Sequence, residues 1–194
     1  MFWTLKTTAL KSPLWIHAAA TAVSFAAFQG TRLFLDKLYA ASGHPVDFAT
    51  GQLAFDGATI FGYYEVMREA GGFGTYIQTQ LFDFAFIASV IAFGICLGTL
   101  IARMDAPRSA TFMMGIGAAY FAFLGGCFDA LENVVSFGLM QFESQIPQLL
   151  AFVYSSLAAA KFISLTLAMA LALAALITGI ISNGMRMMRS EARA

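Results

Sequence analysis

Charged residues are scarce in this chain. Only 11% of its 194 residues are charged, 11 basic and 11 acidic, whereas a soluble globular domain carries about 25%. The hydrophobic share is 59%, with 20 Phe and 10 Met. The deficit of charge excludes an ordinary soluble domain and predicts a lipid-embedded protein. The balance of the two signs gives no argument for nucleic acid, so we expect no nucleic-acid partner.

Cysteine and histidine are nearly absent as well. The two cysteines, Cys96 and Cys127, lie in apolar runs without CxxC spacing, which excludes a thiol redox enzyme that uses such a pair. We interpret both as packing residues, since a buried free cysteine behaves as a small hydrophobe. The chain has no HExxH, His pair, Cys cluster or phosphate-binding glycine loop. No metal and no cofactor are therefore predicted.

Four apolar runs reach the length of about 20 residues that a bilayer span requires. They cover about residues 13–31, 81–102, 110–140 and 147–182. Ser12 with Pro13, and Pro147, are typical of helix starts. The third and fourth runs exceed the hydrocarbon thickness and are expected to tilt or project beyond it. We predict an all-α membrane protein, a four-transmembrane-helix bundle in which residues 1–194 form one integral membrane domain.

The long first connection, about residues 32–80, is expected to form a small helical extracytoplasmic cap over the bundle. Ser42-Gly43-His44-Pro45 interrupts the first helix. A helix is predicted over 57–70, with Ile60, Phe61, Tyr64 and Met67 on one face. The glycines that begin at Gly71 end it, because glycine is favoured just after a helix C-terminus.

The basic residues predict the orientation. Seven fall on one side of the four spans, whereas the long connection has three and the last connection has none. The seven are Lys6, Lys11, Arg103, Arg108, Arg186, Arg189 and Arg193. The positive-inside rule then places both termini in the cytoplasm. For a bacterial chain this describes a multi-pass protein of the inner membrane with a periplasmic first connection.

Charged residues inside the apolar runs are the strongest functional signal. Asp129, Glu132 and Asn133 are spaced i, i+3, i+4, so on a helix they share one face. Lys161 and Asp83 lie alone within two other runs. Each charge costs roughly 2.5–3.5 kcal/mol in hydrocarbon even on the lenient insertion scale. We therefore expect the charges to meet inside the bundle, along faces of small residues that allow close helix packing.

All four charges are expected in the outer half of the membrane, where Lys161 can pair with Asp129 or Glu132. Three acids against one base imply that at least one carboxyl group carries a proton. A neutral acid beside an ionised one suits acid–base chemistry. Asp129, Glu132 and Lys161 are thus the candidate catalytic residues. The candidate binding residues are Asn133, Asp83, Tyr76 and Tyr154.

A structural interpretation stands beside this one. A network of Lys161, Asp129, Glu132 and Asn133 can simply fix the register of the helices. Asp83 alone, near the interface, is compatible with partial solvation, and Tyr76 with an interfacial aromatic. His17, far from the cluster, is interpreted as interfacial or packed rather than as a ligand.

The segment Asp129-Ala130-Leu131-Glu132-Asn133 resembles the Asp-x-x-Glu-Asn motif of a group of small four-span bacterial membrane proteins. The upstream stretch 72–76, Asp83 and Lys161 are similar to that group too, so the resemblance covers most of residues 60–165. It implies an architecture and candidate residues, and no activity. A weaker likeness, at the level of fold alone, is to the emopamil-binding and sigma-2 receptor class, which handles sterol-like ligands.

Three functions remain open at this point. The first is an inner-membrane protein whose buried carboxylate and lysine site binds or transforms a lipid or other hydrophobic molecule. The second is a proton-coupled transporter or pore subunit, which would need a homo-oligomer to enclose a path. The third is a non-catalytic assembly or scaffold subunit with a stable partner. Membrane lipids are the expected partners, and the sequence does not decide whether the chain is an enzyme.

Overall fold

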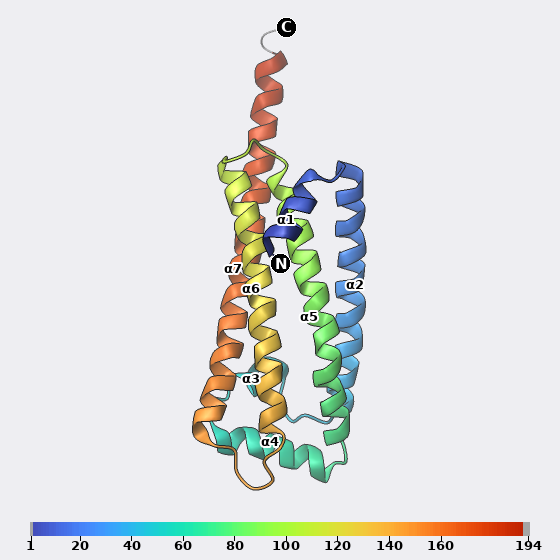
Figure 1. The fold of residues 1–194 in the computed structure, drawn as a ribbon, viewed down its shortest axis with the longest axis vertical. Coiled ribbons are helices and arrows are strands. Elements are labelled where there is room, and N and C mark those ends of the chain that lie inside the picture. Colours follow the sequence, from blue (N-terminus) through green and yellow to red (C-terminus); the bar gives the residue numbers. More distant parts are fainter. Residues whose placement is uncertain (1, 192–194) are drawn as a thin grey trace. The chain divides into compact units, whose positions relative to one another are not determined.

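The computed structural model describes residues 2–191, which form helices and no strand. The predicted all-α class is therefore confirmed for this part of the chain. The helices are drawn in Figure 1 as α1 (Phe2–Lys11), α2 (Leu14–Ala41), α3 (Phe48–Gln52), α4 (Gly57–Glu69), α5 (Phe73–Ala102), α6 (Ala110–Leu139) and α7 (Gln148–Glu191). The first helix and the short α3 were not predicted from the sequence.

Three helices among the described residues are long and apolar enough to cross a membrane. They are α5, α6 and the part of α7 from Gln148 to Met188. Helix α5 begins at Phe73, ahead of the predicted start at 81, and α7 continues past 182. Helix α2 contains the predicted first span, and its role as a span stays a prediction.

Helix α6 shows how the apolar helices divide their faces. The side chains of Leu131 and Val134 are 53% and 60% exposed, whereas Glu132 and Asn133 between them are fully buried. Successive helical residues are rotated by about 100° around the helix axis, so the two buried polar residues and the two exposed apolar residues lie on different sides of α6. An apolar outer face with polar residues inside is the arrangement that a lipid surrounding requires.

Two compact units make up the chain. Unit 1 comprises residues 1–26, 90–124 and 164–194, and unit 2 comprises residues 27–89 and 125–163. In unit 1, α5 and α6 approach closely at two glycines. A methyl group on Gly98 would lie 2.6 Å from the carbonyl oxygen of Gly115 and 2.7 Å from the amide nitrogen of Ala119. Only glycine permits this contact, which serves the packing that drives helix association in lipid.

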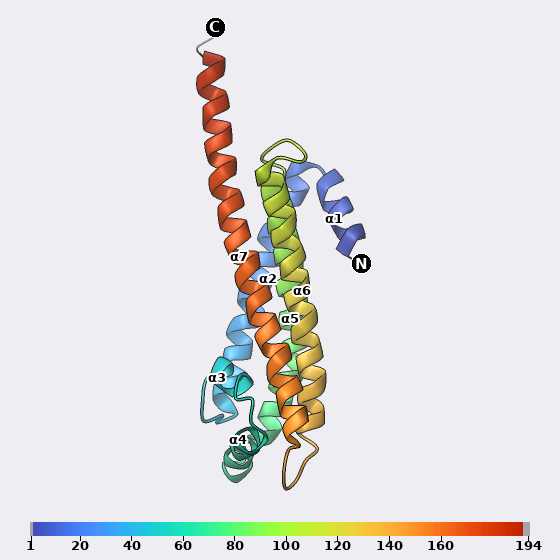
Figure 2. The ribbon, with the colours of Figure 1, turned by 90° about the vertical axis from the view of Figure 1, so that its left-hand side faces the viewer.

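Helix α1 folds back against α5 and α6 in unit 1 (Figure 2). Phe2 is buried against Ile95 and Ala119. Arg103, just after α5, donates hydrogen bonds from Nη1 to the carbonyl oxygens of Ser12 at 2.8 Å and Ala9 at 3.3 Å. The C-terminal carbonyl groups of α1 are thus satisfied by a cation, which is the favourable pairing at that end of a helix.

His17 is buried in unit 1, in agreement with its interpretation as a packed residue. Its Nδ1 lies 3.2 Å from Nη1 of Arg103, and its Nε2 lies 3.0 Å from the carbonyl oxygen of Cys96. A guanidinium group only donates and a carbonyl oxygen only accepts. The neutral tautomer with hydrogen on Nε2 therefore fits both contacts.

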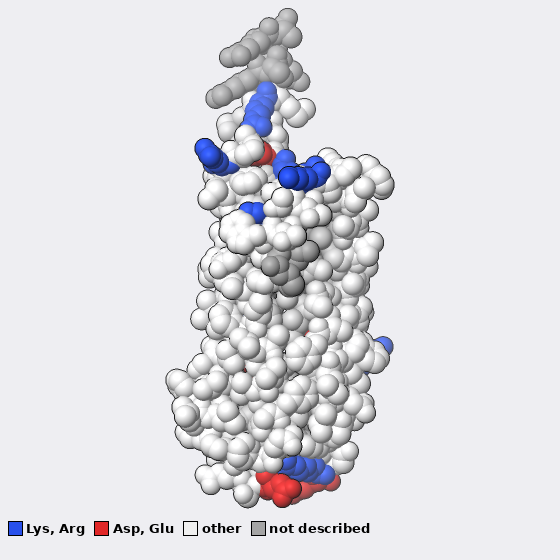
Figure 3. All heavy atoms as spheres, in the orientation of Figure 1, with Lys and Arg blue, Asp and Glu red and all other residues white. Residues whose placement is uncertain are grey.

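Basic side chains gather around the α5–α6 connection of unit 1 (Figure 3). Arg186 of α7 forms an ion pair with Asp105 of this connection, and Asn183 donates to the carbonyl oxygen of Met104 at 3.0 Å. Two other basic residues used for the predicted orientation are not placed: Arg193 lies outside the described residues, and the side chain of Arg189 is not described.

In unit 2, α3 and α4 pack at the end where α5 begins (Figure 1). Asp56 caps α4 and accepts hydrogen bonds from the amide and hydroxyl groups of Thr59, which hold the pKa of this carboxyl below its usual value. Gly71 ends the helix with a φ of +73°, and the amide of Gly72 donates to the carbonyl oxygen of Met67. The predicted helix and its glycine stop are thus confirmed.

The buried face of α4 forms the core of this end of unit 2. Ile60, Tyr64 and Met67 point inward, as the sequence predicted, and contact Leu139, Ile146 and Tyr154 from α6, α7 and their connection. Two side chains of α7 bind the segment that joins α3 to α4: Gln148 donates to the carbonyl oxygen of Phe55 at 2.8 Å, and Ser155 accepts from its amide at 3.0 Å.

Candidate functional site

The candidate site lies within unit 2 and is centred on one face of α6. Asp129, Glu132, Asn133 and Ser136 are all buried on this face. Their spacing of three and four residues aligns them along the helix, as the sequence predicted. The same helix contributes no other charged side chain, so its polar groups are concentrated on the inner side of unit 2.

Lys161 of α7 lies at the centre of this cluster, with 4% of its surface exposed. Its Nζ donates to Oδ1 of Asp129 at 3.0 Å, to Oε1 of Gln52 at 2.9 Å and to Oε2 of Glu132. An ammonium group has three N–H donors, and each has an acceptor here. The predicted pairing of Lys161 is therefore observed with both acids rather than with one.

Gln52 is the unexpected member of the cluster. It ends α3, is 109 residues from Lys161 along the chain, and is buried. Its bond to Lys161 fixes the short helix α3 to α7. No pattern in the sequence singles out this glutamine, because its role depends on where the long connection folds.

Asp83 and Asn133 form a second polar pair. Nδ2 of Asn133 donates to Oδ2 of Asp83 at 2.7 Å, and both side chains are buried. This bond joins α5 to α6 next to the Lys161 cluster, since Asn133 directly follows Glu132. Asp83 is therefore a buried member of the site within unit 2, and partial solvation, the alternative interpretation, does not describe it.

Three buried tyrosines lie beside the carboxyl groups. Tyr64 and Tyr76 have ring centroids 5.7 Å apart, and Tyr154 belongs to the same core cluster. Burial raises the pKa of Tyr64, on α4, to about 12, so this phenol stays neutral and can donate a hydrogen bond. The predicted binding residues Tyr76 and Tyr154 thus come together with a third tyrosine that the sequence only placed on the inner face of α4.

Several buried polar atoms of unit 2 have no hydrogen-bond partner among the described residues. They are Oε1 of Glu132, Oδ1 of Asn133, Oγ of Ser136, Oη of Tyr64 and Oε1 of Gln80. Gln80 lies on the same face of α5 as Tyr76 and Asp83, at spacings of four and three residues. Buried polar atoms are nearly always paired in proteins, and leaving one unpaired costs about 1–3 kcal/mol. The oxygens of Glu132, Asn133 and Gln80 are therefore available to a polar partner, whereas the hydroxyl groups of Tyr64 and Ser136 lie close enough to interact with each other.

The charges of the site do not balance. Asp83, Asp129 and Glu132 face Lys161, so full ionisation leaves an excess of two negative charges among the buried side chains described in unit 2. Burying an unpaired ion costs several kcal/mol. Each proton on a carboxyl group and each positive group from outside reduces this excess by one charge, and the site is therefore suited to accept either.

The described residues contain no group of three or more His, Cys, Asp or Glu side chains placed to hold a metal ion. Both cysteines are free and partly buried. The chemistry that the arrangement offers is accordingly that of carboxyl, ammonium, amide and phenol groups: proton transfer, hydrogen bonding and attraction of positive charge.

Comparison with protein-family models, with curated proteins and with solved structures finds no match to this chain. The functional argument therefore depends on the geometry of the site.

Proposed function

We propose that this chain is a four-span membrane protein whose unit 2 binds the polar end of a lipid or other hydrophobic molecule at the buried site. Helices α2, α5, α6 and α7 are the spans, and α3 and α4 form the extracytoplasmic cap. Both termini face the cytoplasm, and the membrane is the inner membrane of a bacterium. The apolar outer face of α6 supports a lipid surrounding, and the distribution of basic residues supports the orientation.

The observation that carries this proposal is the unpaired carboxylate oxygen of Glu132. One oxygen of Glu132 is bound to Lys161, whereas the other is buried with no partner among the described residues. Unpaired atoms of Asn133, Ser136, Tyr64 and Gln80 accompany it. A ligand whose polar end supplies hydrogen-bond donors satisfies these groups, and its apolar part matches the surrounding helices.

Each residue has a distinct role in this proposal. Glu132 is the proton-transfer and ligand-binding group, since its second carboxylate oxygen is buried without a partner among the described residues. Asp129 and Lys161 hold its charge and position, and Asn133 is oriented by Asp83. Tyr64 supplies a neutral phenol. This arrangement serves ligand binding directly and proton transfer to or from a bound molecule.

The experiment is to purify the protein in mild detergent and identify co-purifying hydrophobic molecules by mass spectrometry. Glu132→Gln is expected to lose most of a molecule that the wild-type protein retains. The control is Glu69→Gln, which removes the same charge from an exposed position on α4 and is expected to retain it. Equal retention by all three proteins would remove the basis of the proposal.

One observation favours a second candidate, a structural role for the same cluster. Lys161, on α7, binds one side chain of α3 and two of α6, and its three donors are all used. Such a network fixes helix register in some proteins. It does not account for the buried and unpaired Oε1 of Glu132, which a purely structural network would be expected to pair.

A further inference from the structure

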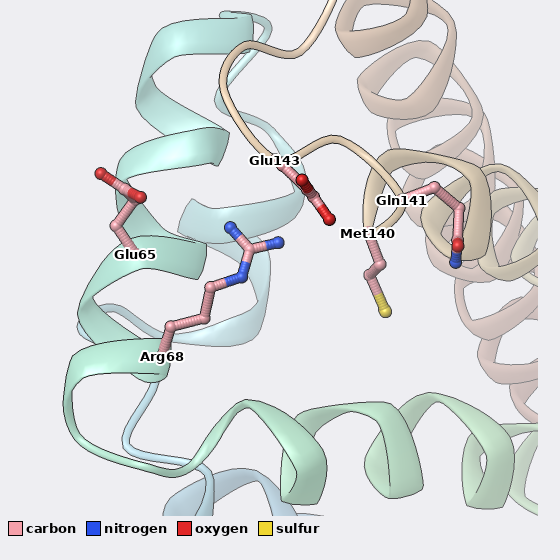
Figure 4. Close-up of a pocket in the computed structure, with 5 residues that line it drawn as sticks. All are labelled: Glu65, Arg68, Met140, Gln141 and Glu143. Carbon is pink, nitrogen blue, oxygen red and sulfur yellow. The ribbon is translucent and has the colours of Figure 1, made fainter.

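A hollow of about 400 Å³ opens on the surface of unit 2. It is lined by Glu65 and Arg68 of α4 and by Met140, Gln141 and Glu143 just after α6. Figure 4 shows the guanidinium group of Arg68 extending from α4 toward Glu143 on the facing loop. Groups of both signs thus meet around one space, and its volume lies in the range of small-molecule sites, about 300–1,000 Å³.

Arg68 is held in place from two sides. Its Nη2 donates to the carbonyl oxygen of Phe142 at 3.2 Å, and its guanidinium carbon lies 4.4 Å from the centre of the Phe73 ring. Stacking and a backbone bond fix the plane of the group. A guanidinium group has five N–H donors, so the remaining donors are preorganised for a planar or tetrahedral anion in the hollow.

Acidic groups surround this fixed cation. Glu65 and Glu143 are exposed at the hollow, and Figure 3 shows acidic side chains grouped around a basic one at the α4 end of unit 2. Carboxylates accept hydrogen bonds from a primary ammonium group. The complementary ligand therefore carries an anion and an ammonium group a short distance apart.

Residues that line the hollow lie about one helical turn along the chain from residues of the buried site. Arg68 follows Tyr64 by one turn of α4, and Met140, just after the end of α6, follows Ser136 by four residues. Oη of Tyr64 and Oγ of Ser136 are two of the buried atoms without a partner among the described residues. Tyr64 is 1% exposed and Met140 is also buried. Both belong to one core cluster of unit 2, and Met140 also lines the hollow.

We propose that the hollow recognises a phosphate joined to a short primary amine, as in a phosphoethanolamine headgroup. The phosphate binds Arg68, and the ammonium group binds Glu143 and Gln141. Its further role, as the outer mouth through which such a headgroup reaches the buried site, rests on the proposed function. A quaternary amine lacks the N–H donors, and a headgroup without an amine lacks the cation, so both bind more weakly.

The test uses full-length protein in nanodiscs that contain equal amounts of phosphatidylethanolamine, phosphatidylcholine and phosphatidylglycerol. Wild type is expected to retain phosphatidylethanolamine preferentially after transfer to detergent, measured by mass spectrometry. Glu143→Gln should reduce this preference about tenfold, the equivalent of one charged hydrogen bond. Arg68→Gln should instead reduce the retention of all three lipids, because each carries the phosphate that Arg68 binds. Glu69→Gln, also on the α4 end but outside the lining, is expected to leave the preference unchanged.

The choice of variant and a soluble probe make the outcome decisive. Arg68 also contacts Phe142 and Phe73, so its variant can lose fold as well as binding, whereas Glu143 is an exposed loop residue whose variant tests the headgroup alone. Free phosphoethanolamine added to the wild-type protein distinguishes a soluble ligand from a lipid. Equal retention of the three lipids together with no binding of free phosphoethanolamine would overturn the proposal.

The two proposals fail in different ways. If Glu132→Gln loses a bound molecule while Glu143→Gln changes no lipid preference, the buried site stands and the hollow is not a headgroup site. If Glu143→Gln removes the preference while Glu132→Gln changes nothing, the headgroup site stands without the buried one.

Discussion

Replacing Lys161 by Met is expected to destabilise the protein strongly. Methionine is similar in length, but it removes one buried positive charge and all three N–H donors from the centre of the site. Oδ1 of Asp129, Oε2 of Glu132 and Oε1 of Gln52 then lose their common partner. Two carboxyl groups and an amide remain buried around an apolar side chain.

The magnitude follows from these losses. Removing one partner of a buried ion pair costs about 3–5 kcal/mol, because the other charge stays buried. The orphaned amide oxygen of Gln52 alone adds about 1–3 kcal/mol. Uptake of protons by Asp129 and Glu132 relieves part of the charge, so we expect the free energy of unfolding to fall by about 3–5 kcal/mol in total. A chain of this size loses about 2–4 °C of melting temperature per kcal/mol.

Glu132→Gln is the matched comparison, because it changes the same network without creating an unpaired ion. Glutamine keeps an oxygen within reach of Lys161, and Lys161 keeps its bonds to Asp129 and Gln52. The free energy of unfolding is therefore expected to change by about 1 kcal/mol or less. Ligand retention should nevertheless fall, since the variant loses the charge proposed to receive the ligand.

Thermal unfolding in detergent is the assay, applied to wild type, Lys161→Met, Glu132→Gln and the double variant. The double variant should recover part of the loss of Lys161→Met, because one of the two stranded carboxylates is gone, and the coupling of the two changes measures this recovery. A Lys161→Met protein that unfolds within about 1 kcal/mol of wild type would refute the claim that Lys161 stabilises the fold through this network.

Three other outcomes follow from the fold. Gly98→Ala is expected to lower the free energy of unfolding by about 1–3 kcal/mol by overpacking α5 against α6. Gly74→Ala, with no atom within 4 Å of the added methyl group, should be neutral or slightly stabilising. Equal melting temperatures for the two variants would count against the close approach of α5 and α6. Arg103→Gln should speed amide exchange in α1 without a matching loss of global stability, since its Nη1 binds the last carbonyl groups of that helix. Protection of the Thr59 amide should fall in acid, because the Asp56 pKa is lowered in the fold: the cap is complete above the ordinary carboxyl pKa and is lost as pH falls through the lower folded value. An Asp56→Asn protein, whose cap cannot titrate, should keep its protection over that range, and an equal loss would contradict the assignment.

Much of the site was predictable because it depends on local periodicity. Asp129, Glu132 and Asn133 share a face by helical spacing alone, and the cost of charge in hydrocarbon predicts that Lys161 joins them. The structure brings these residues together in unit 2, and Asp83 with them. The helix over 57–70 and its glycine stop were predictable for the same reason, since apolar spacing and turn chemistry act within a few residues.

The contacts that the sequence did not reveal are long-range. Gln52 reaches Lys161 only because the connection after α2 folds back over unit 2, and no local pattern marks one glutamine among several. Helix α1 was expected merely to lie at an interface, yet Phe2 is buried against Ile95 and Ala119. The unpaired state of Oε1 of Glu132 is likewise a property of the packed structure, because it depends on which partners fail to reach it.

The two oxygens of Glu132 reconcile the structural and functional interpretations of the cluster. Oε2 is bound by Lys161 and belongs to the network that fixes α3, α6 and α7, whereas Oε1 is equally buried and unpaired among the described residues. A carboxylate required only for register would be expected to use both oxygens, since an unpaired one costs about 1–3 kcal/mol. A carboxylate that served only to bind a ligand would not need an ion pair with Lys161, whose ammonium group also binds two other side chains. Glu132 thus belongs to a rigid network through one oxygen and presents an unsatisfied hydrogen-bond acceptor through the other. A rigid network keeps a binding group in position before its ligand arrives.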